Sequence, residues 1–173
     1  SQLKTVKIGS PEDPSNFVNA VIDKNSFEKC KGYIERAEKS SEASILFGGK
    51  CDDSKGWFVE PTVIETTNPK YESVCEEIFG PILPILSYQS NSDIDTIISS
   101  FEKPLSLYLF SQNKSFIDEI LQKYSFGGGC IKDTVIHLVN HRLPFGGGGH
   151  SGMGAYHGKL SFDIGSHKKA IVK

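Results

Sequence analysis

The stretch EEIFGPILPIL, residues 76–86, decides the fold of this chain because it joins a turn signal to a buried strand. Gly80-Pro81 breaks any regular element, and the apolar run Ile82–Leu86 has the length of a strand. Two acids and an aromatic residue come directly before the break. The sequence therefore predicts a turn that places a carboxylate beside an aromatic ring at the edge of a sheet, where the pair can hold a sugar hydroxyl and a flat ring.

Strand and helix patterns alternate after this stretch. The predicted strands cover residues 82–88, 105–110 and 130–131. The predicted helices cover residues 91–101 and a segment that begins at Asn113 or Ser115 and is ended by Gly127, Gly128 and Gly129. A β-α-β-α-β order with helices of about ten residues is typical of a parallel sheet with right-handed crossovers. We therefore expect an α/β fold with three layers, in which helices cover both faces of the sheet.

The first 75 residues show one strong helical pattern. Apolar residues recur at helical spacing over residues 26–40, with Asn25 or Ser26 as the N-cap, and they comprise Phe27, Cys30, Ile34 and Ala37. Strands are predicted at residues 18–22, 44–47 and 57–64. Pro61 cannot donate a backbone hydrogen bond, so the last of these strands is predicted to lie at an edge or in a bulge.

Composition excludes several classes of protein. A chain of 173 residues with 38% hydrophobic and 23% charged residues is long and apolar enough to form a globular domain. The net charge of −2 gives no basis for a nucleic-acid partner, and no apolar run approaches the ~18 residues of a membrane span. The four cysteines form no CxxC pair, which indicates reduced thiols in the cytoplasm or the mitochondrial matrix.

The tail from about residue 141 contains the glycine-rich run PFGGGGHSGMG at residues 144–154. Gly147, Gly149 and Gly152 have the spacing of a GxGxxG dinucleotide fingerprint, but no strand precedes them and no helical pattern follows. A structural loop near an active site or a subunit contact is therefore favoured over an independent nucleotide-binding domain. His137 and His141 are four residues apart but lack a helical context, so hydrogen-bonding roles are favoured over a metal site. Residues 170–172 predict a terminal strand.

Two further groups of side chains are candidates for catalysis or ligand binding. Cys130 or Cys75 can pair with a histidine as a nucleophile, although a small buried thiol is the commoner role. The acids beside Cys75 oppose formation of its thiolate. Glu76 and Glu77 are adjacent and point in different directions, so they do not form a facing acid–base dyad. One of them is expected to face solvent, and the other is a candidate ligand contact.

EEIFGP at residues 76–81, and PFGG at residues 144–147 followed by Ser151-Gly152, resemble two motifs of the aldehyde dehydrogenase superfamily. Nearly the whole chain is similar to the C-terminal third of such an enzyme. Residues 6–81 resemble Δ1-pyrroline-5-carboxylate (glutamate semialdehyde) dehydrogenase, an enzyme of proline catabolism. Residues 102–173 resemble the dimeric class 3 and fatty aldehyde branch. Family members usually carry Asn where Lys132 stands.

The resemblance implies an oxidoreductase that converts an aldehyde to a carboxylic acid with NAD or NADP. The substrate would be glutamate semialdehyde or a medium- or long-chain aldehyde. Glu77 would correspond to the acid that binds the nicotinamide ribose hydroxyls, and Phe79 would pack near the nicotinamide ring. The substrate and active-site loop would comprise Pro144, Phe145, Gly146 and Gly147. The semialdehyde branch anchors its substrate carboxylate in the tail, and the tail here resembles the other branch.

The resemblance also places the nucleophilic cysteine, the general-base glutamate and the Rossmann region before the segment seen here. Residues 1–140 are then expected to form the part of the catalytic domain that follows the nucleophile, and residues 141–173 to form the glycine-rich loop and an oligomerisation tail. This chain by itself is expected to be inactive, and the parent enzyme to be a homodimer. The alternative is a non-catalytic remnant that serves as an assembly or binding module.

Overall fold

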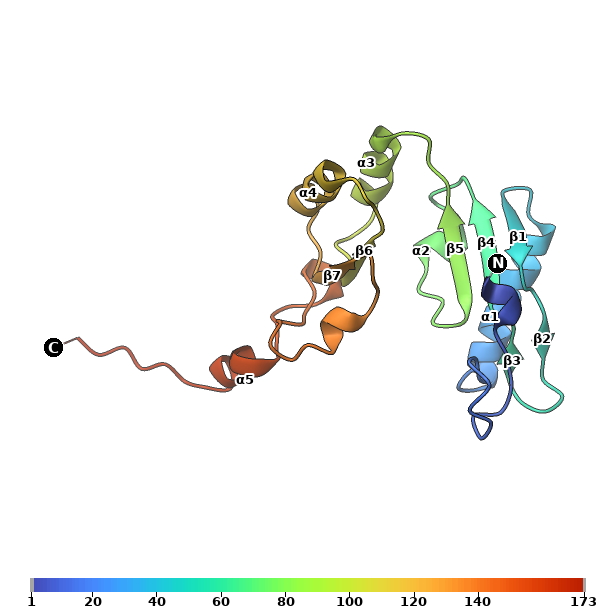
Figure 1. Cartoon of the computed structure of the whole chain (residues 1–173), viewed down its shortest axis with the longest axis horizontal. Coiled ribbons are helices and arrows are strands. Elements are labelled where there is room, and N and C mark those ends of the chain that lie inside the picture. Colours follow the sequence, from blue (N-terminus) through green and yellow to red (C-terminus); the bar gives the residue numbers. More distant parts are fainter. Residues whose placement is uncertain (1, 173) are drawn as a thin grey trace. The chain divides into compact units, whose positions relative to one another are not determined.

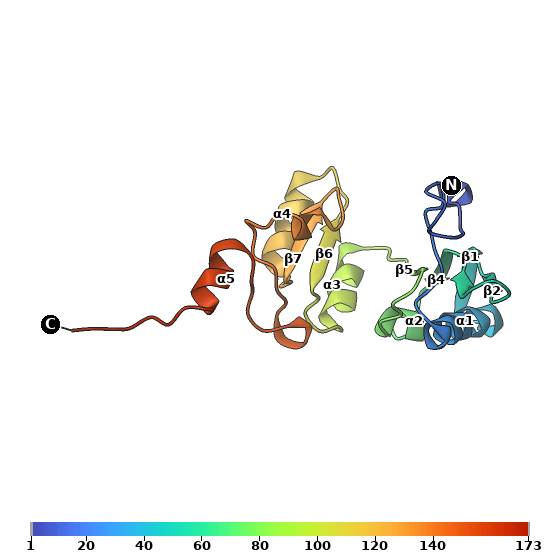
Figure 2. The ribbon, with the colours of Figure 1, turned by 90° about the horizontal axis from the view of Figure 1, so that it is seen from below.

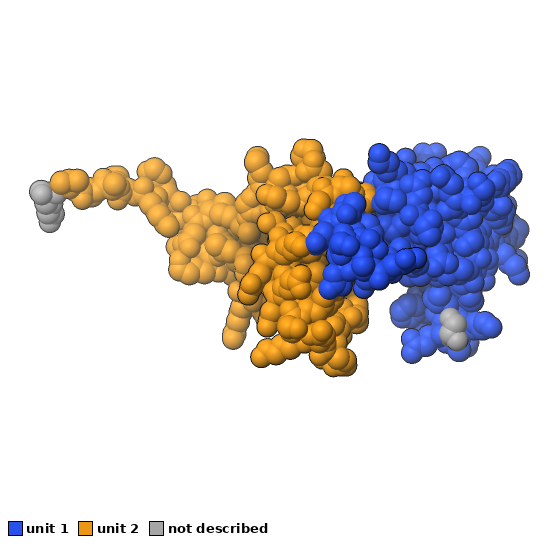
Figure 3. All heavy atoms as spheres, turned by 90° about the horizontal axis from the view of Figure 1, so that it is seen from above, with its two compact units in different colours: residues 1–97 blue, residues 98–173 orange. Residues whose placement is uncertain are grey.

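The computed structural model describes residues 2–172 and has an α/β fold (Figure 1). Two compact units divide the chain, Ser1–Ile97 and Ile98–Lys173 (Figure 3). The helices are α1 (Lys24–Lys39), α2 (Glu72–Cys75), α3 (Asn91–Ser99), α4 (Lys114–Lys123) and α5 (Gly158–Ile164). The strands are β1 (Ala43–Phe47), β2 (Cys51–Asp52), β3 (Phe58–Val59), β4 (Thr62–Thr66), β5 (Ile82–Leu86), β6 (Ser106–Leu109) and β7 (Gly128–Ile131). The 3₁₀ turns are η1 (Gln2–Thr5), η2 (Ile136–Leu138) and η3 (Gly149–Ser151).

Helix α1 confirms the amphipathic pattern and supplies the core of the first unit. Asp23, rather than Asn25 or Ser26, is its N-cap, and its side chain accepts a 2.7 Å hydrogen bond from the Ser26 backbone N–H. The predicted apolar residues Phe27, Cys30, Ile34 and Ala37 are all at most 2% exposed. Full burial of a side chain such as Phe27 or Ile34 contributes about 1.5–3 kcal/mol.

The first unit contains a three-stranded sheet in the order β1-β4-β5. Strand β1 pairs antiparallel with β4, and β4 pairs parallel with β5, with Ile64 opposite Pro84. Helices α1 and α2 lie on one face of this sheet (Figure 2). The core between them includes Ile64 at 0% exposure and Ile78 at 7%, so the turn before β5 is itself anchored in the core.

Two predictions in this unit are wrong. Residues 18–22 do not form a buried strand: Val18 makes an isolated bridge to Ile8, and Ile22 is 91% exposed. The edge position predicted from Pro61 is wrong for β4, which follows Pro61 and is the central strand, whereas the predicted bulge agrees with a register shift between Ile45 and Phe47 in the pairing of β1 with β4. Since the ladder begins only at Thr62, the missing N–H of the proline removes no hydrogen bond from it.

The second unit is built on a β6-α4-β7 crossover with two parallel strands, in which Tyr108 pairs with Cys130. Asn113 caps α4 as predicted and accepts a 3.2 Å hydrogen bond from the Phe116 N–H. Gly128 and Gly129 do not end the helix but open strand β7. A Cβ at Gly129 would collide with the carbonyl oxygen of Leu107, so glycine permits the close approach of the two strands.

The tail differs from its prediction in two respects. Residues 170–172 form no strand, because none of the described residues pairs with them, and a lone strand has no partner for its backbone hydrogen bonds. Helix α5 was not predicted. It has only seven residues, and a 2.6 Å ion pair between Lys159 and Asp163 links one turn to the next. No helix among residues 2–172 is long and apolar enough to cross a membrane.

Candidate functional site

The turn at residues 76–81 joins α2 to β5 in the first unit. Ile78 points into the core, whereas Phe79 is 86% exposed and adopts a left-handed backbone conformation with φ of 56°. The Pro81 carbonyl accepts a 2.9 Å hydrogen bond from the Thr62 N–H, which fixes the end of the turn to the sheet. The backbone conformation at Phe79 is costly for a residue with a side chain, and its neighbours hold it in place.

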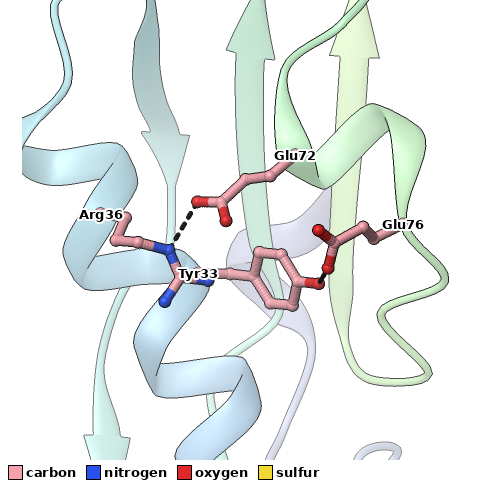
Figure 4. A network of polar contacts seen from close by, with 4 residues as sticks. All are labelled: Tyr33, Arg36, Glu72 and Glu76. Atoms are coloured by element: carbon pink, nitrogen blue, oxygen red, sulfur yellow. Dashed lines mark hydrogen bonds and ion pairs between the residues drawn. The ribbon is translucent and has the colours of Figure 1, made fainter.

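Two side chains of helix α1 bind this turn. The Tyr33 hydroxyl donates a hydrogen bond to the Glu76 carboxylate (Figure 4). The Lys29 ammonium donates a 2.6 Å hydrogen bond to the Glu77 carbonyl oxygen. Beside this contact, Arg36 Nε lies 2.7 Å from Glu72 Oε1 of α2 (Figure 4). The Arg36 guanidinium also stacks over the Tyr33 ring at 5.0 Å.

Burial and the charges of this network change the pKa of Tyr33. Burial raises the pKa of Tyr33 to about 12, assisted by its hydrogen bond to Glu76 and by the negative charges of Glu76 and Glu72. Arg36 opposes this rise, and the Glu72 hydrogen bond raises the pKa of Arg36 in turn. Tyr33 therefore remains a neutral hydrogen-bond donor over the physiological range of pH.

The two acids of the turn have different surroundings. Both residues are exposed, but the Glu76 carboxylate is engaged by Tyr33. The Glu77 carboxylate makes no hydrogen bond or ion pair with any residue in the range 2–172. The adjacent acids thus do not form a dyad: Glu76 fastens the turn, and Glu77 is free for a ligand.

A surface hollow of about 330 Å³ lies at this turn. Its lining residues include Glu77, Phe79 and Ser73. The hydroxyl of Ser73 is buried and lacks a hydrogen-bond partner within the described chain. A free carboxylate suits the hydroxyls of a ribose, and an exposed aromatic face suits a flat ring, so these residues fit a nicotinamide nucleotide.

The glycine-rich loop of the second unit is tightly packed backbone. The Phe145 and Tyr156 backbones exchange two 3.0 Å hydrogen bonds. A Cβ at Gly146 would collide with the Gly154 carbonyl, and one at Gly147 with the Ser151 carbonyl. The Ser151 hydroxyl in addition accepts a 2.9 Å hydrogen bond from the Gly148 N–H. Only glycine fits these positions, which explains the composition of the loop.

Aromatic rings and a hollow flank this loop. The Phe145 ring stacks on His157 at 5.8 Å and meets Tyr156 edge-on at 5.7 Å. A separate hollow of about 320 Å³ is lined in part by Pro144, Gly146 and Gly147. Three of the four candidate loop residues therefore line one hollow of the second unit, and Phe145 is not among its lining residues.

The GxGxxG spacing does not have the context of a dinucleotide fingerprint. Gly149 lies in the 3₁₀ turn η3, and the segment before it makes only the isolated bridge at Phe145. The next helix, α5, begins at Gly158. Within residues 2–172, the strand–turn–helix arrangement that this motif requires is missing.

The histidines are not gathered at one point. His137 contacts Cys130, whereas His141 packs edge-on against His157 at 5.1 Å. The part of the chain that the structure describes holds no group of three His, Cys, Asp or Glu side chains suited to a metal ion. All four cysteines are free thiols.

Sequence reasoning missed the residues that support the site. Tyr33 is three residues from Cys30 and belongs to the buried face of α1, so helical spacing was able to reveal its burial. Its bond to Glu76, 43 residues further along, left no local signal. The same holds for Lys29, whose hydrogen bond to the Glu77 carbonyl oxygen joins residues 48 positions apart.

Known proteins are similar to this chain over most of its length. A family model described as "Aldehyde dehydrogenase family" matches residues 1–171. The mitochondrial Δ1-pyrroline-5-carboxylate dehydrogenase of Dictyostelium discoideum is 44% identical over 156 residues, which are 87% of this chain and 28% of that protein. Aldehyde dehydrogenase family 3 member A2 of Rattus norvegicus is 40% identical over 152 residues, 88% of this chain and 30% of that protein. Both resemblances drawn from the sequence are thereby confirmed.

Solved structures show the same fold. Staphylococcus aureus AldH in a substrate-bound state has a TM-score of 0.81 and 37% identity, covering 95% of this chain and 36% of that one. Betaine aldehyde dehydrogenase from Staphylococcus aureus, in complex with NAD+, has a TM-score of 0.82 and 26% identity, covering 94% and 33%. The chain spans about a third of the length of the curated relatives it matches.

Proposed function

Because the chain belongs to the aldehyde dehydrogenase family, we propose that it forms the C-terminal portion of an enzyme that oxidises an aldehyde to a carboxylic acid with NAD or NADP. One observation carries the proposal. The turn at residues 76–81 is fastened to α1 by Tyr33 and Lys29, while Glu77 and Phe79 face solvent. A rigid turn with two uncommitted side chains is suited to positioning a ligand.

In this proposal the Glu77 carboxylate accepts hydrogen bonds from the nicotinamide ribose, and the Phe79 ring packs beside the nicotinamide. The cofactor, when bound, supplies the hydride acceptor. Hydride transfer depends on the distance between donor and acceptor carbons, so residues that restrict the ring contribute through orientation. The nucleophile and the general base are assigned to the remainder of the enzyme.

For the substrate we favour a medium- or long-chain aldehyde over glutamate semialdehyde. The proposed loop, Pro144 to Gly147, places Phe145 in contact with the rings of Tyr156 and His157, and a cluster of rings beside the loop suits contact with an apolar chain. Glutamate semialdehyde is the second candidate because a relative at 44% identity is a pyrroline-5-carboxylate dehydrogenase. A panel of both aldehyde types, compared by kcat/KM in the full-length enzyme, separates the two.

The direct test of the cofactor role is Glu77→Gln in the full-length protein that contains this chain. We expect affinity for the preferred dinucleotide to fall about ten-fold or more, because a hydrogen bond to a charged group contributes about 1.5–3 kcal/mol. Glu12→Gln, an exposed acid of the N-terminal loop, is the control and should leave affinity unchanged. Unchanged affinity and hydride transfer in Glu77→Gln would show that the assignment is wrong.

The 173-residue chain by itself gives a second test. We expect it to show no aldehyde oxidation and no saturable binding of NAD or NADP, since the Rossmann region is assigned to the remainder of the enzyme. Saturable binding to the isolated chain would contradict that assignment. If the native protein lacks the remaining segments altogether, the alternative of an assembly or binding module replaces the enzymatic proposal.

We further propose that the parent enzyme is a homodimer in a reducing compartment, either the cytoplasm or the mitochondrial matrix. The four free thiols support the compartment. The exposed apolar residues Ile171 and Val172, which pair with no strand among residues 2–172, support a tail that pairs with a second copy. A monomer by sedimentation at micromolar concentration would oppose the dimer.

A further inference from the structure

A thiol and an imidazole meet in the second unit, whereas the residues proposed for the cofactor belong to the first. Cys130 Sγ lies 3.5 Å from His137 Nδ1, within the range of a hydrogen bond to sulfur. Cys130 belongs to strand β7, and His137 belongs to the 3₁₀ turn η2. Strand β7 and η2 are separated by only four residues, so this contact is local in sequence.

The chain makes room for this contact. Two residues before Cys130 on the same face of β7, a Cβ at Gly128 would come within 2.9 Å of the His137 ring. Glycine at that position therefore lets the imidazole lie against the strand. Lys132 and Val135, in the connecting turn, both have positive φ, at 62° and 64°. These conformations are unusual for residues with side chains, and they fold the turn back toward β7.

The imidazole has few other partners. Its Nε2 is buried and has no hydrogen-bond partner among the described residues. Tyr108, the strand neighbour of Cys130, meets the His137 ring edge-on at 5.7 Å. Nδ1 is thus the nitrogen in contact with a polar group, and that group is the thiol.

We propose that Cys130 is a site of covalent modification by Michael acceptors, such as α,β-unsaturated aldehydes and maleimides, with His137 as its proton acceptor. The thiol proton passes to His137 Nδ1 as the sulfur attacks the β-carbon of the electrophile. A C–S bond forms, the C=C π bond breaks, and the α-carbon takes up the proton from the imidazolium. No group leaves, and no oxidant or reductant is required.

The other three cysteines lack this arrangement. Burial raises the pKa of Cys30, which is fully buried, and that of Cys51, which is partly buried. The thiol of Cys75 is exposed and lies 3.3 Å from the Pro69 carbonyl oxygen, an acceptor that cannot take up a proton. Cys75 is therefore an internal reference: it is more accessible than Cys130 but is not paired with a base.

The test measures the rate of alkylation of each cysteine in the whole 173-residue chain. Limiting N-ethylmaleimide or crotonaldehyde is added at neutral pH, and labelled peptides are quantified by mass spectrometry at successive times. We expect Cys130 to react at least ten-fold faster than Cys75, since a positioned base typically accelerates such a step by about 10²–10⁴-fold. In denaturing urea the Cys130 rate should fall toward the Cys75 rate, and only the effect of the acids next to Cys75 in the sequence should remain. A native Cys130 rate at or below the Cys75 rate would overturn the proposal.

Two variants separate base action from packing. His137→Gln keeps a hydrogen-bonding side chain without a basic nitrogen and should lower the Cys130 rate to that of Cys75. His141→Gln, an exposed imidazole four residues away, is the matched control and should leave the Cys130 rate unchanged. An unchanged Cys130 rate in His137→Gln would refute the role of the imidazole. If His137→Gln alters the circular dichroism, the native-to-urea comparison in the unsubstituted chain decides.

Discussion

The contact between Tyr33 and Glu76 permits a sharp test of how the turn is held. Tyr33→Phe removes one hydroxyl and keeps a ring that is 98% buried, so packing of the core is preserved. A hydrogen bond to a charged group contributes about 1.5–3 kcal/mol. Because water can reach the exposed Glu76 carboxylate after the change, we expect the lower end, a loss of about 1.5 kcal/mol.

Trp57 offers a selective probe of this unit. It is the single tryptophan of the chain, and its ring lies 5.5 Å from that of Phe27 in the core. With a urea m-value of about 1.5 kcal/mol per M, the midpoint of the fluorescence transition should fall by about 1 M. Tyr88→Phe, at a tyrosine that is 55% exposed, is the control and should change stability by less than about 0.5 kcal/mol.

The effect should also depend on pH, with a defined sign. The pKa of Tyr33 is raised from 10.0 to about 12 in the folded chain, so the fold favours the neutral hydroxyl. The stability that Tyr33 contributes is therefore fully present below pH 10 and is lost as pH rises toward 12. The difference between the unsubstituted chain and Tyr33→Phe should shrink over that interval. A constant difference, or equal effects of Tyr33→Phe and Tyr88→Phe, would refute the reasoning.

Two further stability predictions follow from single backbone positions. Gly80→Ala would drive a Cβ into the buried Cys30 sulfur and should lower the free energy of unfolding by about 1–3 kcal/mol, measured by Trp57 fluorescence. The double variant with Cys30→Ala should lose less stability than the sum of the two single variants. Strict additivity would show that the two groups do not collide. Lys132→Gly should stabilise the second unit by about 0.5–1 kcal/mol, because Lys132 has φ of 62°, and thermal unfolding followed by circular dichroism measures it. A lower melting temperature would mean that the 2.8 Å bond from Lys132 to Gln112 outweighs the backbone strain.

Sequence patterns predicted an element well where a local feature determines it, either the spacing of apolar residues or a capping residue. The apolar spacing of α1 and the Asn113 cap of α4 are of this kind, and both were found within two residues. Errors arose where tertiary contacts override local preference. Gly128 and Gly129 suggested a helix end, yet they lie in a strand that pairs with β6, where a Cβ would meet the His137 ring at Gly128 and the Leu107 carbonyl at Gly129. Residues 170–172 have strand composition, but no strand in the described part of the chain pairs with them.

The candidate sites also differ in how far the sequence predicted them. Glu77 and Phe79 were identified from a motif, and their exposure agrees with a binding role that remains a prediction. The pairing of Cys130 with a particular histidine was not predictable, because five histidines follow it and only the positive φ values at Lys132 and Val135 select His137. Neither Lys nor Val favours that conformation, so the sequence carried no signal for the turn.

In the turn at residues 76–81, residues that support the fold alternate with residues proposed to bind a ligand. Alternate positions are used by the fold: Glu76 accepts a hydrogen bond from Tyr33, Ile78 enters the core, and Gly80 lies against Cys30. The positions between them, Glu77 and Phe79, contribute little to the stability of the unit, and Phe79 even adopts a strained backbone. A side chain that is exposed on a strained backbone is costly to the fold, which agrees with the ligand-binding role proposed for Phe79. Substitutions at 76, 78 and 80 should therefore act through stability, whereas Glu77→Gln, which leaves the backbone unchanged, should act through ligand affinity.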